Sequence, residues 1–183
     1  MARLADTPVL ETERLILRAP CAADWPPSAA FLASERARFV GGPVEAPAAW
    51  RIFGHVVGHW VLRGFGLFVF CDKATGTALG TAGPWFPEGW PEPEIGWTLW
   101  RAGDEGRGLA REAAEATLTH AYCGLGWRTA VSYIDPANAR SIALAERLGA
   151  ARDEAASGPD ASTLVYRHRD AEARAGFATA GTA

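Results

Sequence analysis

The sequence has few cysteines and no apolar run long enough to cross a membrane. Its three cysteines are Cys21, Cys71 and Cys123. Their number is odd and no two have the spacing of a metal-binding pair, so we expect three reduced thiols, as in a cytosolic protein. The N-terminal segment has no long apolar stretch after its basic residue, so neither a signal peptide nor a membrane span is expected. These absences predict a cytoplasmic protein that does not bind membranes.

An excess of positive charge is also absent, because the formal net charge is -3. Without a broad positive field to attract phosphates, nucleic acid is not an expected partner. The apolar fraction of 49% and the charged fraction of 21% are typical of a globular protein. The 183 residues suit one domain. We expect that domain over residues 1–170, followed by a flexible tail of mostly Ala, Gly and Thr over 171–183.

Hydrophobic periodicity predicts alternating strands and helices, with turn residues between them. The predicted strands cover residues 14–18, 66–71, 77–86, 94–100, 127–134, 150–153 and 162–168. The predicted helices cover residues 24–36, 45–62, 108–123 and 135–148, with Asp24 and Asp135 as N-caps. The second helix is expected to pack through an apolar face formed by Trp50, Phe53, Val57 and Val61. No repeat or long linker interrupts this order, which predicts one mixed α/β domain.

The loop between the strand at 94–100 and the helix at 108–123 carries the clearest chemical signal. Glycines at a helix start expose backbone N–H groups without intrahelical partners, and these groups attract anions such as a pyrophosphate. Gly106 and Gly108 permit close backbone approach. Arg107 and Arg111 add positive charge near the same end. The loop therefore predicts a phosphate-binding site.

Two common phosphate-binding motifs lack residues that they require here. A P-loop needs a lysine followed by Ser or Thr after its second glycine, and this loop has neither. A dinucleotide-binding turn needs a third spaced glycine, which is also missing. An unrelated α/β protein that binds another phosphate ligand through this loop is a further alternative.

The segment Glu105-Gly-Arg-Gly-Leu-Ala110 resembles the coenzyme A pyrophosphate loop of the GNAT acetyltransferases, whose pattern is Gln/Arg-x-x-Gly-x-Gly/Ala. Gly108 and Ala110 match, whereas Glu105 replaces the usual Gln or Arg. About thirty residues later, Asn138-Ala-Arg-Ser141 and the helix that follows resemble the family's Asn-x-x-Ser segment. The likeness covers roughly residues 10–169 and is greatest to the RimJ/RimL-like branch, which acetylates protein N-termini.

This resemblance implies a GNAT-like α/β (α+β) fold, with a mixed, mostly antiparallel central sheet that splays at the cofactor site between flanking helices. It implies acetyl-CoA as cosubstrate and no metal. The strand end would pair with the pantetheine arm, the glycine loop would hold the pyrophosphate, and Asn138 and Ser141 would meet the pantetheine or sulfur. For Asn138, a helix-start hydrogen bond is the alternative interpretation. The implied cofactor-binding residues are Leu99, Trp100, Glu105, Gly106, Arg107, Gly108, Leu109, Ala110, Arg111, Asn138 and Ser141.

Acetyl transfer to an alkyl amine needs a base, because the ammonium form has a pKa of about 10. Alternation along the strand places Glu94, Gly96 and Thr98 on one face. The opposite face carries Ile95, Trp97 and Leu99. A carboxylate beside a glycine leaves room for a substrate, and some GNAT members have a glutamate base at the corresponding position. Glu94 is therefore the candidate catalytic base, and a solvated or paired strand carboxylate is the alternative.

The leaving thiolate needs a proton or a hydrogen bond. Many GNAT members supply a tyrosine at the position that matches Ala145 here. Ser141 is the candidate catalytic donor in its place, and Tyr133 is a second choice. The missing tyrosine and the substituted Glu105 also support an alternative function, a coenzyme A-binding regulatory or interaction module with little or no catalysis.

Histidine, cysteine and tryptophan residues outside these motifs are interpreted as follows. His55 and His59 lie four apart on a helix without the glutamate or third ligand of a zinc site, so we expect a surface or cleft role. Cys123 is expected to be buried and unreactive. The tryptophans within residues 85–100 either fill the core or line a substrate cleft. They are Trp85, Trp90, Trp97 and Trp100.

Together these features predict an N-acetyltransferase that moves an acetyl group directly from acetyl-CoA to a primary amine within a ternary complex. The sequence leaves the acceptor open between a protein N-terminus, a small-molecule amine and an amino acid. It also leaves a homodimer open, because dimers are common in the branch that the sequence resembles.

Overall fold

The computed structural model describes residues 4–169, so the predicted tail at 171–183 lies outside the described residues. The strands are β1 (Leu10–Glu11), β2 (Leu15–Arg18), β3 (Phe68–Asp72), β4 (Ala78–Trp85), β5 (Glu94–Leu99), β6 (Val131–Ile134), β7 (Ala151–Arg152) and β8 (Leu164–Arg167). The main helices are α1 (Trp25–Leu32), α2 (Ala46–Arg63), α3 (Leu109–Thr119) and α4 (Ala139–Arg147). Over this part of the chain, no helix combines the length and the hydropathy that a membrane crossing requires. Apart from the short β1, the predicted order of strands and helices is confirmed.

The strands form one sheet of eight in the order β1-β2-β3-β4-β5-β6-β8-β7. Every neighbouring pair is antiparallel except β5 and β6, which are parallel. These two strands pair at a single position, Glu94 with Val131, and diverge beyond it. The hydroxyl of Ser132 donates to the Ile95 carbonyl at 2.6 Å and reinforces the junction. The predicted mixed, mostly antiparallel and splayed sheet is therefore confirmed.

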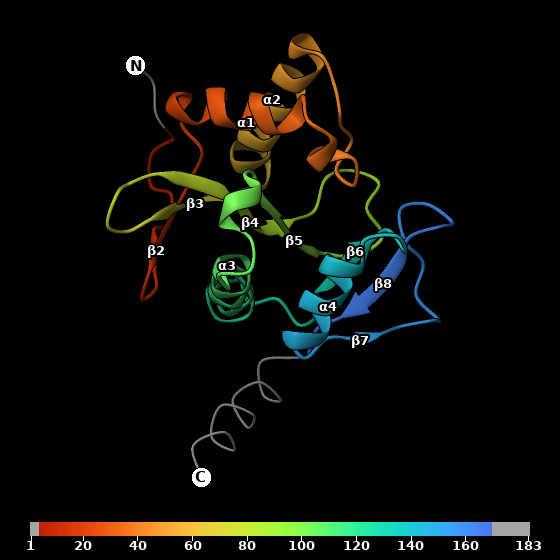
Figure 1. The fold of residues 1–183 in the computed structure, drawn as a ribbon. Coiled ribbons are helices and arrows are strands. Elements are labelled where there is room, and N and C mark those ends of the chain that lie inside the picture. The colour runs from red at the N-terminus through yellow and green to blue at the C-terminus, as the bar shows by residue number, and fades with distance from the viewer. Residues whose placement is uncertain (1–3, 170–183) are drawn as a thin grey trace.

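Helices cover both faces of the sheet, with α1 and α2 on one side and α3 and α4 on the other (Figure 1). Alternation along β3 explains this arrangement, because Phe68 and Phe70 pack toward α3 while Val69 and Cys71 pack toward α1 and α2. A further cluster joins α3 to α4 through Leu118 and other apolar residues. The gap between the diverging strands β5 and β6 lies between these two layers of helices.

The predicted apolar face of α2 is wrong in part. Phe53 is buried as expected, but Trp50 and Val61 are 57% and 68% exposed. The buried face runs instead through Ala49, Phe53 and Trp60, and Trp60 donates its indole N–H to the Leu67 carbonyl at 3.0 Å. This helix has apolar residues on two stripes, and packing against the sheet selects the stripe that contains Trp60.

The predicted helix boundaries also need correction. Asp24 does not cap α1 through its side chain, because its buried carboxylate forms a two-point ion pair with Arg18 at 2.7 and 2.8 Å. The helix predicted over 24–36 ends at Leu32, and a separate short turn covers Glu35–Ala37. Helix α4 begins at Ala139 rather than after Asp135, because the Asn138 side chain provides the cap.

The C-terminal end of α3 departs from the predicted helix. The α-helix stops at Thr119 and the chain continues as one π-helical turn over His120–Gly124. This turn buries Tyr122 but leaves Cys123 exposed, so the expectation of a buried Cys123 is wrong. All three cysteines are free thiols.

Candidate functional site

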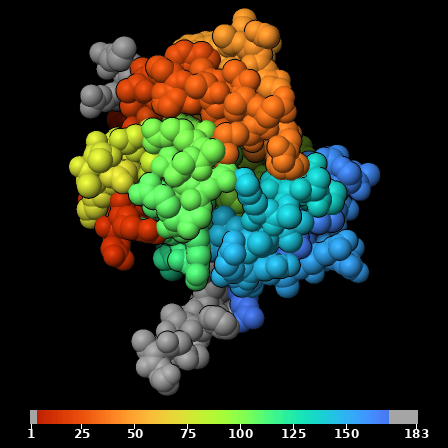
Figure 2. Space-filling model, in the orientation of Figure 1, coloured from red at the N-terminus to blue at the C-terminus, as the bar shows by residue number. Residues whose placement is uncertain are grey.

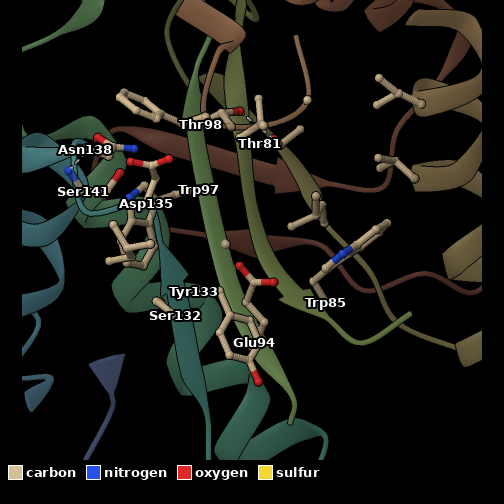
Figure 3. A pocket seen from close by; sticks show the side chains of 18 of the residues that line it. Thr81, Trp85, Glu94, Trp97, Thr98, Ser132, Tyr133, Asp135, Asn138 and Ser141 are labelled. Carbon is tan, nitrogen blue, oxygen red and sulfur yellow. Dashed lines mark hydrogen bonds between the residues drawn. The ribbon is translucent and has the colours of Figure 1, made fainter. Parts of the chain in front are cut away.

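A cavity of about 660 Å³ lies where β5 and β6 diverge. One side of it is walled by α2 and β4, and the other by β6 and the segment leading into α4. Figure 3 shows Glu94 between Trp85 and Tyr133, with Asp135, Asn138 and Ser141 grouped on the other side of β5. The cavity is thus continuous past both candidate catalytic residues.

Glu94 lies on the strand face that alternation predicted, with Gly96 and Thr98 beside it in the cavity wall. Burial of its carboxyl raises the pKa of Glu94 to about 7. A hydrogen bond from the Trp90 indole to Oε2, at 2.7 Å, opposes part of that rise by stabilising the charged form. At neutral pH the carboxyl can therefore both accept and release a proton.

Hydrogen bonds and ion pairs hold the loop from Pro87 to Pro93 next to Glu94. The backbone N–H of Glu92 donates to the Tyr133 hydroxyl at 3.0 Å, and the Glu92 carboxylate pairs with Arg167 at 2.7 and 2.8 Å. Arg63 reaches the outer end of the loop through Glu88 at 3.1 Å. Together with the Trp90–Glu94 bond, these contacts fix the loop over the cavity.

Trp85 is held from behind by His59. The two rings stack with centroids 4.4 Å apart and an interplanar angle of 19°. His59 is itself fixed at both nitrogens, because Nδ1 lies 2.7 Å from the Phe65 carbonyl and Nε2 accepts the Phe86 backbone N–H at 3.0 Å. His59 is buried, so the expected surface or cleft role is wrong for it, whereas His55 is exposed and lines the cavity.

The second predicted group lies at the start of α4. Asn138 and Ser141 both line the cavity. The Asn138 side chain accepts the Ser141 backbone N–H at 3.2 Å, so the helix-start bond that the sequence offered as an alternative is present. Because the cap occupies the amide oxygen, the Asn138 amide N–H₂ and the Ser141 hydroxyl are the groups available to a ligand. Ala145 is fully buried in the core behind them, so this position does not face the cavity.

The edge of β5 that faces the divergence offers backbone groups to a ligand. The Ile95 carbonyl points toward β6, so by alternation the N–H and C=O groups of Leu99 point to the same side. Trp100 differs from the prediction, because its N–H donates to Leu79 on β4 at 2.9 Å and its ring is buried. Arg36 donates to the carbonyls of Leu99 at 3.0 Å and Trp100 at 3.3 Å, a contact that the sequence did not predict.

The glycine-rich loop has the backbone conformation that anion binding requires. Gly106 and Gly108 have φ angles of +74° and +75°, and Gly108 caps α3 without a side chain. A Cβ at Gly106 would meet no atom within 4 Å. The first N–H groups of α3, including those of Leu109 and Ala110, have no intrahelical acceptor. The Leu109 side chain is buried in the core, so its backbone alone is available to a ligand.

The charged side chains of this loop are engaged within the protein. Arg107 pairs with Asp104 at 3.1 Å, and Arg111 pairs with Glu115 at 2.8 Å, both on the surface. Arg107 also lines a smaller hollow of about 320 Å³ that includes Lys73. Both arginines thus lie near the loop, as the sequence indicates, with exposed guanidinium groups.

Glu105 joins two parts of the chain across the front of the cleft. Its two carboxylate oxygens each lie 2.7 Å from an arginine, Oε1 from Arg36 and Oε2 from Arg140. Figure 2 shows the segment that contains Glu105, in green, between the orange N-terminal helices and the teal surface of α4. No local sequence pattern predicts this bridge, because Glu105 is 69 residues from Arg36 and 35 residues from Arg140.

Comparison with known proteins gives a consistent result. A family model described as an acetyltransferase (GNAT) domain matches residues 14–151. The crystal structure of an acetyltransferase from Agrobacterium tumefaciens str. C58 superposes with a TM-score of 0.85 and 39% identity, over 93% of this chain and 99% of that one. A protein described as a GNAT-family acetyltransferase from Bordetella pertussis has a TM-score of 0.73 and 29% identity, over 88% of this chain and 99% of that one.

A more distant structure contains a bound ligand. RimL, a ribosomal L7/L12 α-N-protein acetyltransferase in complex with coenzyme A, has a TM-score of 0.71 and 17% identity, over 89% of this chain and 98% of that one. At 17% identity this similarity shows a shared fold and nothing more specific.

Proposed function

The chain belongs to the GNAT acetyltransferase family, whose members use acetyl-CoA, and we propose that it transfers the acetyl group directly to a primary amine in a ternary complex. The observation that carries this proposal is the position of Glu94. It is a carboxyl with a pKa of about 7 in the wall of a cavity that also reaches the start of α4.

The residues present suit coenzyme A. The open edge of β5 offers the Leu99 N–H to an extended amide chain such as pantetheine. The α3 N-terminus, with Gly106 and Gly108 in left-handed conformations, offers N–H groups to a pyrophosphate. The Asn138 amide and the Ser141 hydroxyl line the same cavity as Glu94, which supports their proposed contact with the pantetheine or the sulfur. When bound, acetyl-CoA supplies a thioester carbon that an amine can attack, with the coenzyme A thiol as leaving group.

In the proposed reaction, Glu94 takes one proton from the incoming ammonium group, which frees the nitrogen lone pair to attack the thioester carbon. The second proton leaves the nitrogen to solvent as the N–C bond forms, and Glu94 later returns its own proton to solvent. Backbone N–H groups on the open edge of β5 stabilise the negative charge that develops on the acetyl oxygen. As the C–S bond breaks, Ser141 donates a hydrogen bond to the departing sulfur, and the thiol proton comes from solvent. Ala145, at the position where many family members have a tyrosine, is fully buried, so Ser141 is the proposed donor to the sulfur in its place.

Calorimetric titration with acetyl-CoA, with ATP as comparison, tests cofactor binding, and thiol release in the presence of amines tests transfer. We expect Glu94→Gln to lower kcat by about 10²- to 10⁴-fold while the acetyl-CoA Kd stays nearly unchanged. Glu146→Gln is the matched control, because Glu146 is exposed on α4 and does not line the cavity. Wild-type turnover by Glu94→Gln would remove Glu94 as the base, and a failure to bind acetyl-CoA would contradict the proposed function.

A further inference from the structure

The acceptor side of the cavity directs one carboxylate toward a ligand. Three carboxyl groups line the cavity among the residues that the structure describes, Glu94, Asp135 and Asp160. Asp160 accepts four hydrogen bonds from Ser162 and Thr163, and Asp135 accepts the Ala137 N–H at 2.7 Å, so both stabilise their own turns. Glu94 accepts the Trp90 indole N–H at Oε2 and a backbone hydrogen bond from Tyr133, and its Oε1 lies beside Gly96. Of the three carboxyl groups, Glu94 is the one next to the aromatic residues of the cavity wall, so it is placed to meet an ammonium group there.

The walls around that carboxylate are aromatic. Trp85, Trp90 and Tyr133 line the cavity next to Glu94. His59 covers one face of the Trp85 ring, so the ring is held rigidly. Rigid aromatic walls favour a flat apolar ligand, because stacking adds to the gain from buried area.

The floor of this part of the cavity is left open by a glycine. A Cβ built at Gly96 would lie 3.6 Å from Glu94 Oε1 and 3.7 Å from Leu67 Cδ2, both ordinary contact distances. The backbone therefore tolerates a methyl group here, but that group would occupy the space beside the carboxylate. Gly96 accordingly defines room for the part of the ligand that carries the amine.

The loop from Pro87 to Pro93 borders this part of the cavity through Trp90 and is held by several contacts. Glu92 is bound to both Arg167 and Tyr133, and Trp90 is bound to Glu94. Trp90 is the residue of this loop that lines the cavity, and it lies beside Glu94. One carboxylate and aromatic walls together suit a flat aromatic ligand that carries an ammonium group.

We propose that the acceptor is a small arylalkylamine, a primary amine on a short alkyl chain attached to a flat aromatic ring. This inference rests on the proposed acetyltransferase function. The amine nitrogen lies beside Glu94 Oε1 over Gly96, and the ring packs against Trp85 beside the loop from Pro87 to Pro93.

A panel of acceptors in the thiol-release assay tests this class. The panel contains phenylethylamine and tryptamine, hexylamine as an apolar amine without a ring, an aminoglycoside as a polycation, and a peptide with N-terminal alanine. We expect kcat/KM for the two arylalkylamines to exceed that of every other acceptor by about tenfold or more. Equal or faster acetylation of the aminoglycoside, the peptide or hexylamine would overturn the proposal.

A pair of glycine variants locates the binding position. Gly96→Ala should lower kcat/KM for phenylethylamine by about tenfold and leave the acetyl-CoA Kd unchanged. Gly54→Ala is the matched control, because Gly54 is exposed on α2 and a Cβ there would meet no atom within 4 Å. An unchanged kcat/KM in folded Gly96→Ala would refute the placement of the amine.

The outcome is informative even without turnover. If no amine is acetylated, phenylethylamine is titrated into the coenzyme A-bound protein by calorimetry. Binding that Gly96→Ala weakens would support the arylalkylamine class while the proposed transfer fails. Absence of binding would overturn the class itself.

Discussion

Replacing Trp90 with phenylalanine removes the indole N–H that Glu94 accepts, while keeping most of the bulk that shields the carboxyl from water. A hydrogen bond to a charged group contributes about 1.5–3 kcal/mol. One pKa unit corresponds to about 1.4 kcal/mol. We therefore expect Trp90→Phe to raise the pKa of Glu94 by about 1–2 units, from its value of about 7.

The expected rise in the pKa of Glu94 can be measured from the pH dependence of kcat. A base with a higher pKa is protonated at neutral pH, so kcat at pH 7 should fall and recover as pH rises. The profile of kcat against pH, measured with an amine whose own pKa lies outside the scanned window, should keep its shape and move to higher pH. Trp50→Phe, in an exposed tryptophan of α2, serves as the control and should leave the profile in place.

Trp90→Ala separates the hydrogen bond from the shielding. Alanine also removes the bulk over the carboxyl, so water reaches Glu94 and lowers its pKa. The inflection of Trp90→Ala should therefore lie below that of Trp90→Phe. An inflection that stays near 7 in Trp90→Phe, or one that persists in Glu94→Gln, would refute the assignment of this pKa to Glu94.

Three further predictions concern the cofactor loop and the fold. Gly106→Glu should weaken acetyl-CoA binding by about tenfold or more through charge repulsion, whereas Gly126→Glu, at a similar φ of +70° beyond the C-terminal end of α3, should not; equal Kd values would contradict the pyrophosphate assignment. Glu105→Gln should tighten acetyl-CoA binding by roughly threefold at low salt, and Glu146→Gln, at an exposed position on α4, should leave it unchanged; weaker binding in Glu105→Gln would show that the bridge aids the cofactor. Burial lowers the pKa of His59, so its contribution to the free energy of unfolding is present above about pH 6.5 and lost as pH falls. Urea unfolding at pH 7.5 and 5.5 should show this loss, and an identical loss in His59→Gln would exclude His59 as its source.

The sequence was sufficient where local geometry sets the outcome. Alternation along β5 placed Glu94 and Gly96 on one face of the strand, and the glycines at 106 and 108 marked the start of α3. The order of strands and helices along the chain followed from hydrophobic periodicity and turn residues.

Contacts between distant side chains could not be predicted in this way. The bond from Trp90 to Glu94, the bridge from Glu105 to Arg36 and the pairing of Glu92 with Arg167 all depend on how separate elements pack. For α2, two apolar stripes compete on one helix, and only the completed sheet selects between them. The single pairing position of β5 and β6 likewise depends on both strands being in place.

Trp90, in the loop from Pro87 to Pro93, has two effects on the site. Trp90 lines the cavity, and its indole N–H also lowers the proton affinity of Glu94. A ligand that displaces the indole N–H while it still shields the carboxyl from water leaves a carboxylate with a higher proton affinity. An incoming ammonium group can supply a proton to it, whereas a neutral apolar molecule of the same shape cannot. Binding of a neutral apolar molecule would therefore cost electrostatic energy as the molecule enters the cavity, before acetyl transfer begins.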